Sequence, residues 1–187
     1  MDTQTDKALM LKVRDGDLDK LGLLFQRYNR RLFGFFFRLT ARRDVSEDLV
    51  QGVFERILKY RETYTANGSF ATWIFRIARN LHADYHREST CLEQRHESVE
   101  WDQVPGNGLE PGQTSNETFK QQLLEQGIER LDPVKRQTLV LSRFEGFRYR
   151  EIAEIMDCTE SAVKVRIYRA LRELKEIITE LREKEEI

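Results

Sequence analysis

Apolar side chains recur every three or four residues along most of the chain, which is the spacing of a buried stripe on an α-helix. The first stretch with this spacing begins after Asp17, whose side chain we expect to cap the helix. It continues for about six turns and would bury one face, made of Leu18, Leu21, Leu24, Phe25, Tyr28, Leu32, Phe35, Phe36 and Leu39.

Two further helices are predicted before residue 89. The segment DVSEDLVQGVFERILKY has an apolar stripe from Val45 to Leu58, and Asp44 with Glu47 three residues later resembles a capping box. The segment RETYTANGS is rich in turn-forming residues and predicts a loop. After it, FATWIFRIARNLHADYHRE has the helical period again, with Trp73 expected in the core.

Residues 89–118 lack any periodic pattern. Two prolines and three glycines fall between Pro105 and Gly112, and the segment holds six acidic side chains against one basic one. This composition predicts a flexible acidic linker. Its ends would lie roughly 30 Å apart as a coil and roughly 100 Å apart when fully extended.

A second helical block is expected over residues 119–187. Asp132 and Pro133 predict a helix start, and Gly146 lies just past the expected helix end. The short apolar stripe of YREIAEIM is followed by the turn DCT and then by CTESAVKVRIYRALREL. Two helices across so short a turn predict a helix-turn-helix.

The helix after this turn has two possible interpretations. Val163, Ile167, Ala170 and Leu174 form its core seam, so the basic outer face could simply be solvated. The outer face also carries the bare side chain of Val165, which a thymine methyl group could contact, and small residues at the helix start, which would let the helix approach base edges. The residues that would then face DNA are Thr159, Ser161, Ala162, Lys164, Val165, Arg166 and Arg169.

Composition agrees with an all-α protein of two small helical domains, with expected boundaries at 1–88, 89–118 and 119–187. The net charge is −1, which taken alone argues against a nucleic-acid binder, but the acid is concentrated in the linker and in the C-terminal tail. The two cysteines lack a CxxC spacing, and no apolar run reaches the length of a membrane span. These features predict a cytoplasmic protein that does not insert into a membrane.

The motifs in this order resemble the extracytoplasmic-function group of bacterial RNA polymerase sigma factors, in the sigma-70 superfamily. Four segments carry the resemblance, which covers nearly the whole chain: GDLDKLGLLFQRYNRRLFGF, DVSEDLVQGVFERILKY, FATWIFRIARNLHADYHRE and the C-terminal block from LDPVKRQTLVL to ALREL. The resemblance implies that the first domain docks on core RNA polymerase and binds the melted, single-stranded −10 element. It implies that the helix-turn-helix reads the duplex −35 element.

The resemblance also implies roles for particular residues of the first domain. The polymerase would contact Glu47, Asp48, Gln51, Phe54 and Glu55. A base flipped from the −10 strand would lie at the loop 63–69 and the helix after it, against Tyr64, Asn67, Phe70, Arg76, Arg79 and Asn80. An anti-sigma factor is a further expected partner.

Two rival interpretations remain. His82, His86 and Cys91 have a spacing that zinc can use, but no set of carboxylates or nucleophiles completes a catalytic site, so we expect no enzyme activity, cofactor or metal. A stand-alone helix-turn-helix regulator of transcription is the serious alternative. The acidic face from Glu47 to Glu55 argues against it, because that face suits docking on polymerase and has no evident use in a repressor.

Overall fold

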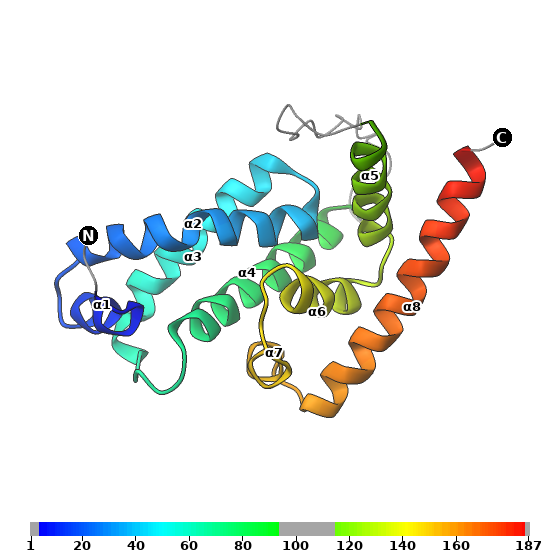
Figure 1. The fold of residues 1–187 in the computed structure, drawn as a ribbon. Helices are drawn as coiled ribbons and strands as arrows, with labels where there is room; N and C mark the ends of the chain where they lie inside the picture. Colours follow the sequence, from blue (N-terminus) through cyan, green and yellow to red (C-terminus); the bar gives the residue numbers. More distant parts are fainter. Residues whose placement is uncertain (1–3, 94–114, 186–187) are drawn as a thin grey trace.

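The computed structural model describes residues 4–93 and 115–185, and every regular element in these residues is helical. The order is α1 (Asp6–Arg14), α2 (Asp19–Thr40), α3 (Arg43–Tyr60), the 3₁₀-helix η1 (Arg61–Thr63), α4 (Phe70–Glu93), α5 (Ser115–Glu129), α6 (Pro133–Arg143), α7 (Tyr149–Met156) and α8 (Glu160–Glu185). Figure 1 shows α1–α4 as one group, here called the N-terminal domain, and α5–α8 as a second group, the C-terminal domain. The expected all-α class is confirmed. In the described part of the chain no helix combines the length and the apolar character needed to cross a membrane.

The N-terminal domain packs α2, α3 and α4 around one core. The apolar stripe of α2 is buried almost as the periodicity predicts, with Leu24, Leu32, Phe35 and Phe36 fully enclosed. Val53 and Ile57 of α3 and Ile74 of α4 meet this stripe with no solvent exposure. Burying a side chain of this size stabilises the fold by about 1.5–3 kcal/mol, so the three stripes account for how the helices assemble.

The C-terminal domain packs α5, α6 and α7 on the long helix α8. Asp132 caps α6, because its carboxylate accepts hydrogen bonds from the backbone N–H groups of Val134 (3.0 Å) and Lys135 (3.2 Å). Gly146 after α6 has φ of 72°, the left-handed region in which glycine is unstrained. The sequence predicts both of these ends correctly.

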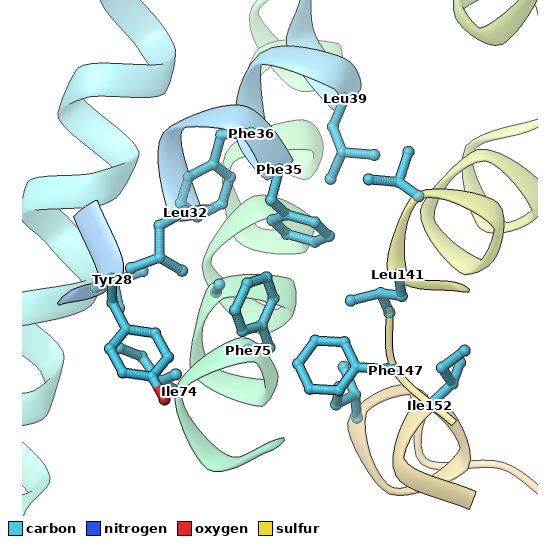
Figure 2. Close-up of a cluster of buried hydrophobic side chains, with 14 of the residues drawn as sticks. Tyr28, Leu32, Phe35, Phe36, Leu39, Ile74, Phe75, Leu141, Phe147 and Ile152 are labelled. Carbon is cyan, nitrogen blue, oxygen red and sulfur yellow. The ribbon is translucent and has the colours of Figure 1, made fainter. Parts of the chain in front are cut away.

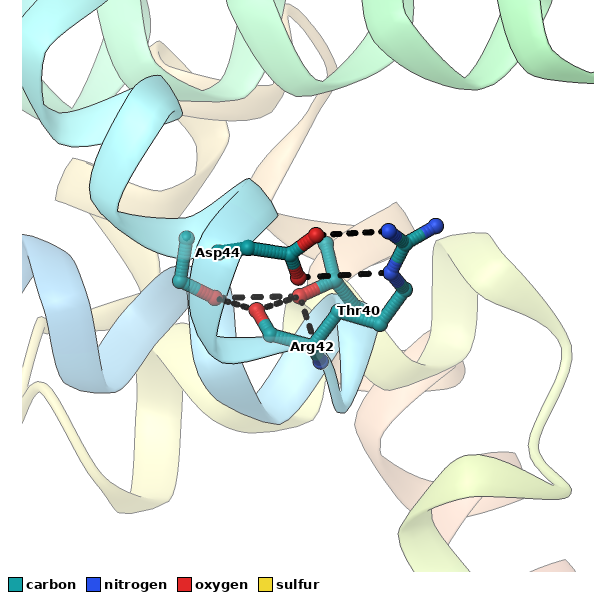
Figure 3. A network of polar contacts seen from close by, with 4 residues as sticks. Thr40, Arg42 and Asp44 are labelled. Carbon is teal, nitrogen blue, oxygen red and sulfur yellow. Dashed lines mark hydrogen bonds and ion pairs between the residues drawn. The ribbon is translucent and has the colours of Figure 1, made fainter. Parts of the chain in front are cut away.

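Two predicted helix starts are wrong. Helix α2 begins at Asp19, Leu18 occupies its N-cap position, and no side chain caps it, so Asp17 does not have the expected role. Helix α3 begins at Arg43, one residue before the expected cap, and no capping side chain bonds its first turn. Asp44 instead accepts hydrogen bonds from the Arg42 guanidinium, and this bond holds the pKa of the Asp44 carboxyl below its usual range (Figure 3).

The corner between α2 and α3 is closed by hydroxyl groups instead of by the capping box. Thr40 Oγ1 lies 3.1 Å from Ser46 Oγ, and the Ser46 hydroxyl donates to the Arg42 carbonyl at 2.6 Å (Figure 3). Thr40 Oγ1 also accepts from the Arg42 backbone N–H at 3.2 Å. Ala41 at the turn has φ of 53°, so the chain reverses through a residue in the left-handed region. This residue is an alanine and not the glycine that usually marks such a turn in a sequence.

The two helical domains pack directly against each other. Helix α7 lies on α4, and α2 contacts α5 and α6. Figure 2 shows that Phe35 and Phe75 of the N-terminal domain continue into Leu141, Phe147 and Ile152 of the C-terminal domain as one apolar cluster. Helices α4 and α5 also extend to Glu93 and from Ser115, so they enter both ends of the range expected for the linker. Its middle, with the prolines and most of the acidic side chains, lies outside the described residues.

Candidate nucleic-acid and polymerase interfaces

Helices α7 and α8 form the predicted helix-turn-helix. The turn is made by Asp157, which has φ of 51°, and by Cys158, whose backbone N–H bonds to the Ala153 carbonyl at 3.0 Å. Thr159 Oγ1 then accepts from the Ala162 backbone N–H at 3.2 Å, so Thr159 caps the start of α8. A left-handed residue followed by a capped helix start fixes the angle between the two helices.

The outer face of α8 is open to solvent. Val163, Ile167 and Ala170 are buried against the domain, as the periodicity predicts. The residues expected to face DNA lie on the opposite side: Thr159, Ser161, Lys164, Val165 and Arg169 are exposed, and Ala162 and Arg166 are half-buried. Basic, small and apolar groups therefore share one accessible helix face, which is the arrangement that major-groove reading requires.

Tyr168 is the most exposed large apolar residue of this face, at 69%. Tyr168 is absent from the residues expected to face DNA, although the helical period places it on the same side of α8 as Val165 and Arg169. Arg166 differs from its neighbours because its guanidinium reaches back to the turn, where Nη1 donates to Cys158 Sγ at 3.4 Å. Arg166 is thus held beside the turn, at the edge of the exposed face.

The loop before α4 is built on buried aromatic rings. Tyr64 is 3% exposed and Phe70 is also 3% exposed. Their rings pack edge to face, with centroids 6.1 Å apart, and Tyr64 also packs edge to face on Trp73 at 4.9 Å. Burial, with the nearby Asp6 as a smaller cause, raises the pKa of the Tyr64 hydroxyl. Trp73, expected in the core, is half-buried and packs against it, while Tyr64 and Phe70 have no free ring face for stacking on a base.

A polar loop and the polar edge of α4 lie on the outside of this aromatic cluster. Ala66 and Gly68 have φ of 57° and 89°, which turns the loop tightly around the exposed Asn67. On α4, Arg76 and Asn80 are exposed, and Arg79 Nη1 donates to Asn80 Oδ1 at 3.0 Å. The expected −10 residues therefore divide into a buried aromatic support and an exposed set of hydrogen-bonding groups.

Helix α3 presents the expected acidic face. Glu47, Asp48, Gln51 and Glu55 are all exposed. Arg43 Nε donates to Glu47 at 2.9 Å and Gln51 Nε2 donates to Glu55 at 3.1 Å, both along the surface of the helix. Phe54 of the same expected set is only 7% exposed.

An apolar patch beside α3 was not expected from the sequence. Phe25 is 42% exposed and its ring lies 4.9 Å from the ring of Phe54. Leu18, at the start of α2, is 50% exposed. The periodic pattern assigns both residues to the buried stripe of α2. It cannot show that no other helix covers the stripe at this end of α2.

Among the described residues, the histidines of α4 have no third metal-ligating side chain beside them. The rings of His82 and His86 lie 6.4 Å apart, and no group of three metal-ligating residues is found among the described residues. The side chain of Cys91 lies outside the described set. Burial, then the charges of His86 and Arg136, lowers the pKa of His82 to about 4.

Two sequence families match the two halves of the chain. The model of "Sigma-70 region 2" matches residues 24–90, and that of "Sigma-70, region 4" matches residues 121–174. The "ECF RNA polymerase sigma-E factor" of Haemophilus influenzae is 30% identical over 89% of this chain and 91% of that protein. The "RNA polymerase sigma factor YlaC" of Bacillus subtilis is 27% identical over 90% of this chain and 98% of that protein.

Solved structures share the fold across both domains. The sigma factor RpoE of Bartonella quintana, solved with the anti-sigma factor NepR, matches 84% of this chain and 96% of that chain with a TM-score of 0.73 at 22% identity. CnrH, solved with the cytosolic domain of CnrY, matches 93% of this chain and 97% of that chain with a TM-score of 0.69 at 20% identity.

Proposed function

Because the chain belongs to the extracytoplasmic-function sigma factors of the sigma-70 family, we propose how its exposed residues divide promoter recognition between the two domains. As a sigma factor it binds core RNA polymerase and directs it to promoter DNA, and the polymerase supplies the chemistry. This replaces the alternative of a stand-alone regulator. The family acts where the polymerase is, so we place this protein in the cytoplasm.

The C-terminal domain is proposed to read the −35 element with the outer face of α8. Ser161 and Ala162 at the helix start let the backbone approach the base edges, and Val165 offers a methyl surface for thymine. Arg169 is exposed and can bond guanine through two parallel N–H groups. Lys164 and Arg166 neutralise phosphates at the groove edge, and Thr159 holds the helix start through its cap.

The N-terminal domain is proposed to hold the melted −10 strand at the loop 63–69. Asn67 and the tightly turned backbone supply donors and acceptors for an unstacked base, while Arg76, Arg79 and Asn80 steady the phosphates beside it. Tyr64 and Phe70 are buried, so we assign them the task of fixing the loop. Stacking of a base on either ring would require the aromatic cluster to open.

Docking on the polymerase is proposed for the exposed face of α3. Asp48, Glu47 and Glu55 present carboxylates to basic residues on the partner, and Gln51 adds a neutral donor. Phe54 is buried and does not contact the polymerase directly. It packs under the exposed ring of Phe25 and so supports the edge of this face. The sigma factor of Bartonella quintana that shares the fold was solved with an anti-sigma factor, and we propose a partner of this kind here too.

The single observation that carries the docking proposal is the row of exposed polar side chains on a helix within the region 2 match. We expect Asp48→Arg to abolish co-purification with core polymerase and run-off transcription, with an unchanged helical circular dichroism spectrum. Glu88→Arg is the matched control, because it reverses an exposed acid on α4 outside the proposed face. Normal co-purification of Asp48→Arg would refute the assignment of this face.

A further inference from the structure

Helix α1 lies beside the loop that we assign to the −10 strand, although it precedes the region 2 match at residues 24–90. It contacts η1, which leads into this loop, and α4, which follows it (Figure 1). Leu9, Met10 and Val13 of α1 are buried with no solvent exposure. Helix α1 is therefore a fixed part of the N-terminal domain, and its polar side chains have defined positions relative to the loop.

Asp6 of α1 holds an aromatic ring that supports the end of the loop. Its carboxylate accepts a hydrogen bond from the Tyr28 hydroxyl at 2.7 Å and another from Arg27 Nη1 at 2.5 Å. The Tyr28 ring is 5% exposed and packs edge to face on Phe70, with the two centroids 5.2 Å apart. Burial, then the hydrogen bond to Asp6, raises the pKa of the Tyr28 hydroxyl, so Tyr28 remains a donor at neutral pH. Asp6 thus acts on Phe70 through Tyr28.

Arg14 of α1 reaches the other end of the loop. Its Nη1 donates to the Tyr64 carbonyl at 3.4 Å, and its Nε donates to Asp15 at 2.9 Å, which orients the guanidinium. The Tyr64 hydroxyl is enclosed and has no hydrogen-bond partner among the described residues. The position of Tyr64 therefore depends on its backbone and on its ring contacts, and Arg14 holds the backbone from outside the loop.

The loop between Tyr64 and Phe70 has a conformation that its surroundings must impose. Ala66 has φ of 57°, in the left-handed region that is unfavourable for a residue with a Cβ. Such a backbone persists where neighbouring groups fix it. Capture of an unstacked base also favours hydrogen-bonding groups that are already in place, because ordering them on binding would cost affinity. A support on both sides of the loop meets both requirements.

We propose that Asp6 and Arg14 are positioning residues for −10 recognition. Asp6 acts through Tyr28 on Phe70, and Arg14 acts on the Tyr64 carbonyl. Helix α1 thus holds both ends of the loop that receives the flipped base, and neither of its two side chains needs to contact that base. The proposal rests on the function proposed above, since it requires the −10 strand to bind at the loop 63–69.

The test measures how tightly the holoenzyme, made of core polymerase and the full chain, holds the flipped base. The probe is the non-template −10 strand of a promoter that the wild-type holoenzyme transcribes. It carries 2-aminopurine at each position in turn, and the position with the largest rise in fluorescence on opening of the promoter is that of the flipped base. The base-capture ratio is the dissociation constant of a single-stranded −10 oligonucleotide with an abasic site at this position, divided by that of the intact oligonucleotide.

Asp6→Ala, Tyr28→Phe and Arg14→Ala should each lower the base-capture ratio about three- to tenfold, as expected for the loss of one hydrogen bond. Tyr28→Phe keeps the ring and removes only the hydroxyl, so it should fold normally. The double variant Asp6→Ala with Tyr28→Phe should lose no more than Asp6→Ala alone, because both changes break the same contact. Asp6→Asn keeps an acceptor oxygen for the Tyr28 hydroxyl and should restore most of the ratio.

Val45→Ala is the control for a loss of stability without a change at the loop. It removes buried methyl groups from α3, about 22 Å along the helix axis from the end that leads into η1. It should leave the base-capture ratio unchanged, and every variant should bind core polymerase and duplex −35 DNA as the wild type does. Unchanged ratios in Asp6→Ala and Tyr28→Phe, or an equal loss in Val45→Ala, would overturn the proposal.

Asn67→Ala separates this proposal from the placement of the −10 strand, because Asn67 is the exposed residue of the loop itself. A lowered ratio in Asn67→Ala with unchanged ratios in the α1 variants would overturn the role of α1 alone. An unchanged ratio in Asn67→Ala would contradict binding of the strand at the loop and, with it, the role of α1.

Discussion

Arg169 is the residue on which the assignment of base reading depends most. It lies on the exposed face of α8, one turn after Val165, and no hydrogen bond within the described residues is recorded for its guanidinium. A bidentate contact with guanine discriminates against other bases by about 1–3 kcal/mol, whereas a phosphate contact weakens binding about equally on all sequences. The two roles can therefore be separated by measuring variants on more than one promoter.

We predict that Arg169→Ala lowers run-off transcription about five- to hundredfold on promoters that carry one particular −35 base. Promoters altered at that base should lose nothing further. Lys164→Ala is the comparison, and it should weaken all promoters by a similar factor and reduce the salt dependence of binding. An equal loss on every promoter with Arg169→Ala would instead assign this side chain to a phosphate.

His82 gives the protein a defined dependence on pH. It is 9% exposed, and burial with the charges of His86 and Arg136 lowers its pKa from 6.5 to about 4. The unfolded chain therefore takes up this proton at a higher pH than the folded one. Its contribution to stability is complete above pH 6.5 and is lost as the pH falls toward 4, by up to about 3 kcal/mol.

Replacing His82 by glutamine should remove this contribution to the pH dependence. We expect the free energy of unfolding, measured with urea at several pH values, to fall less steeply between pH 6.5 and 4 in His82→Gln than in the wild type. His86→Gln is the matched change at an exposed position one turn later. If the free energy of unfolding changes with pH in the same way in both variants, burial of His82 is not the cause of the pH dependence.

The sequence predicts the exposed site residues better than the buried ones. On α8 the period of 3.6 residues separates core from surface without tertiary information, and Val165 and Arg169 lie where it places them. Tyr64 follows no such period, because it is in a loop. Its burial depends on Phe70 and Trp73 of the next helix, and no pattern in the loop shows this.

At the scale of the elements, two helix pairs approach closely through glycine. A Cβ at Gly52 of α3 would lie 2.9 Å from Leu81 Cδ2 of α4, the mobile end of one side chain. A Cβ at Gly127 of α5 would lie 2.8 Å from Leu174 Cδ1 and 3.2 Å from Ile178 Cγ1, both on α8. Two side chains, one of them β-branched and stiff, would have to move at Gly127.

We predict that Gly127→Ala lowers the free energy of unfolding by about 1–3 kcal/mol, because the overpacking outweighs the gain in helix propensity. Gly22→Ala is the matched control, since a Cβ at this exposed helical position meets nothing within 4 Å. It should raise the stability by about 0.5–1 kcal/mol. Chemical denaturation measures both, and a stabilised Gly127→Ala would show that α5 and α8 have room to separate.

Helices could be predicted from the sequence more reliably than their ends. The apolar period of α2, α3, α4 and α8 extends over several turns, so it stays recognisable even where one position departs from it. A helix start depends on one or two hydrogen bonds. At the start of α3 these bonds are made by the hydroxyl groups of Thr40 and Ser46 and not by the predicted capping box of Asp44. Several local solutions have similar energies there, and the sequence cannot choose between them.

At the scale of the whole molecule, the relation between the domains could not be predicted at all. Phe75 lies within α4 and Phe147 lies in the short connection between α6 and α7, and 71 intervening positions separate them in the chain. Arg31 Nε lies 3.2 Å from Glu145 Oε2 across the interface. In the sequence these two residues are even further apart and look like ordinary surface charges. Periodicity therefore cannot predict the interface, because nothing in the local pattern around these residues shows which distant segment they contact.

The shared cluster has a consequence for unfolding. Leu141, Phe147 and Ile152 are buried together with Phe35 and Phe75, so neither domain keeps its full core when the other is lost (Figure 2). Free energy shared across an interface makes two domains unfold together when it exceeds the difference between their own stabilities. The free wild-type chain should therefore show one calorimetric transition.

Glu145→Arg should divide this transition in two, with the C-terminal domain unfolding first. That domain has the smaller core and loses the cover that α4 gives to Phe147. A loss of 1 kcal/mol shifts the melting temperature of a domain of this size by about 4–8 °C, so differential scanning calorimetry can resolve the two steps. Glu176→Arg is the control, because Glu176 pairs with Arg172 of the same helix, and it should keep the single transition. Two transitions in the wild type would mean that the contact is too weak to couple the domains.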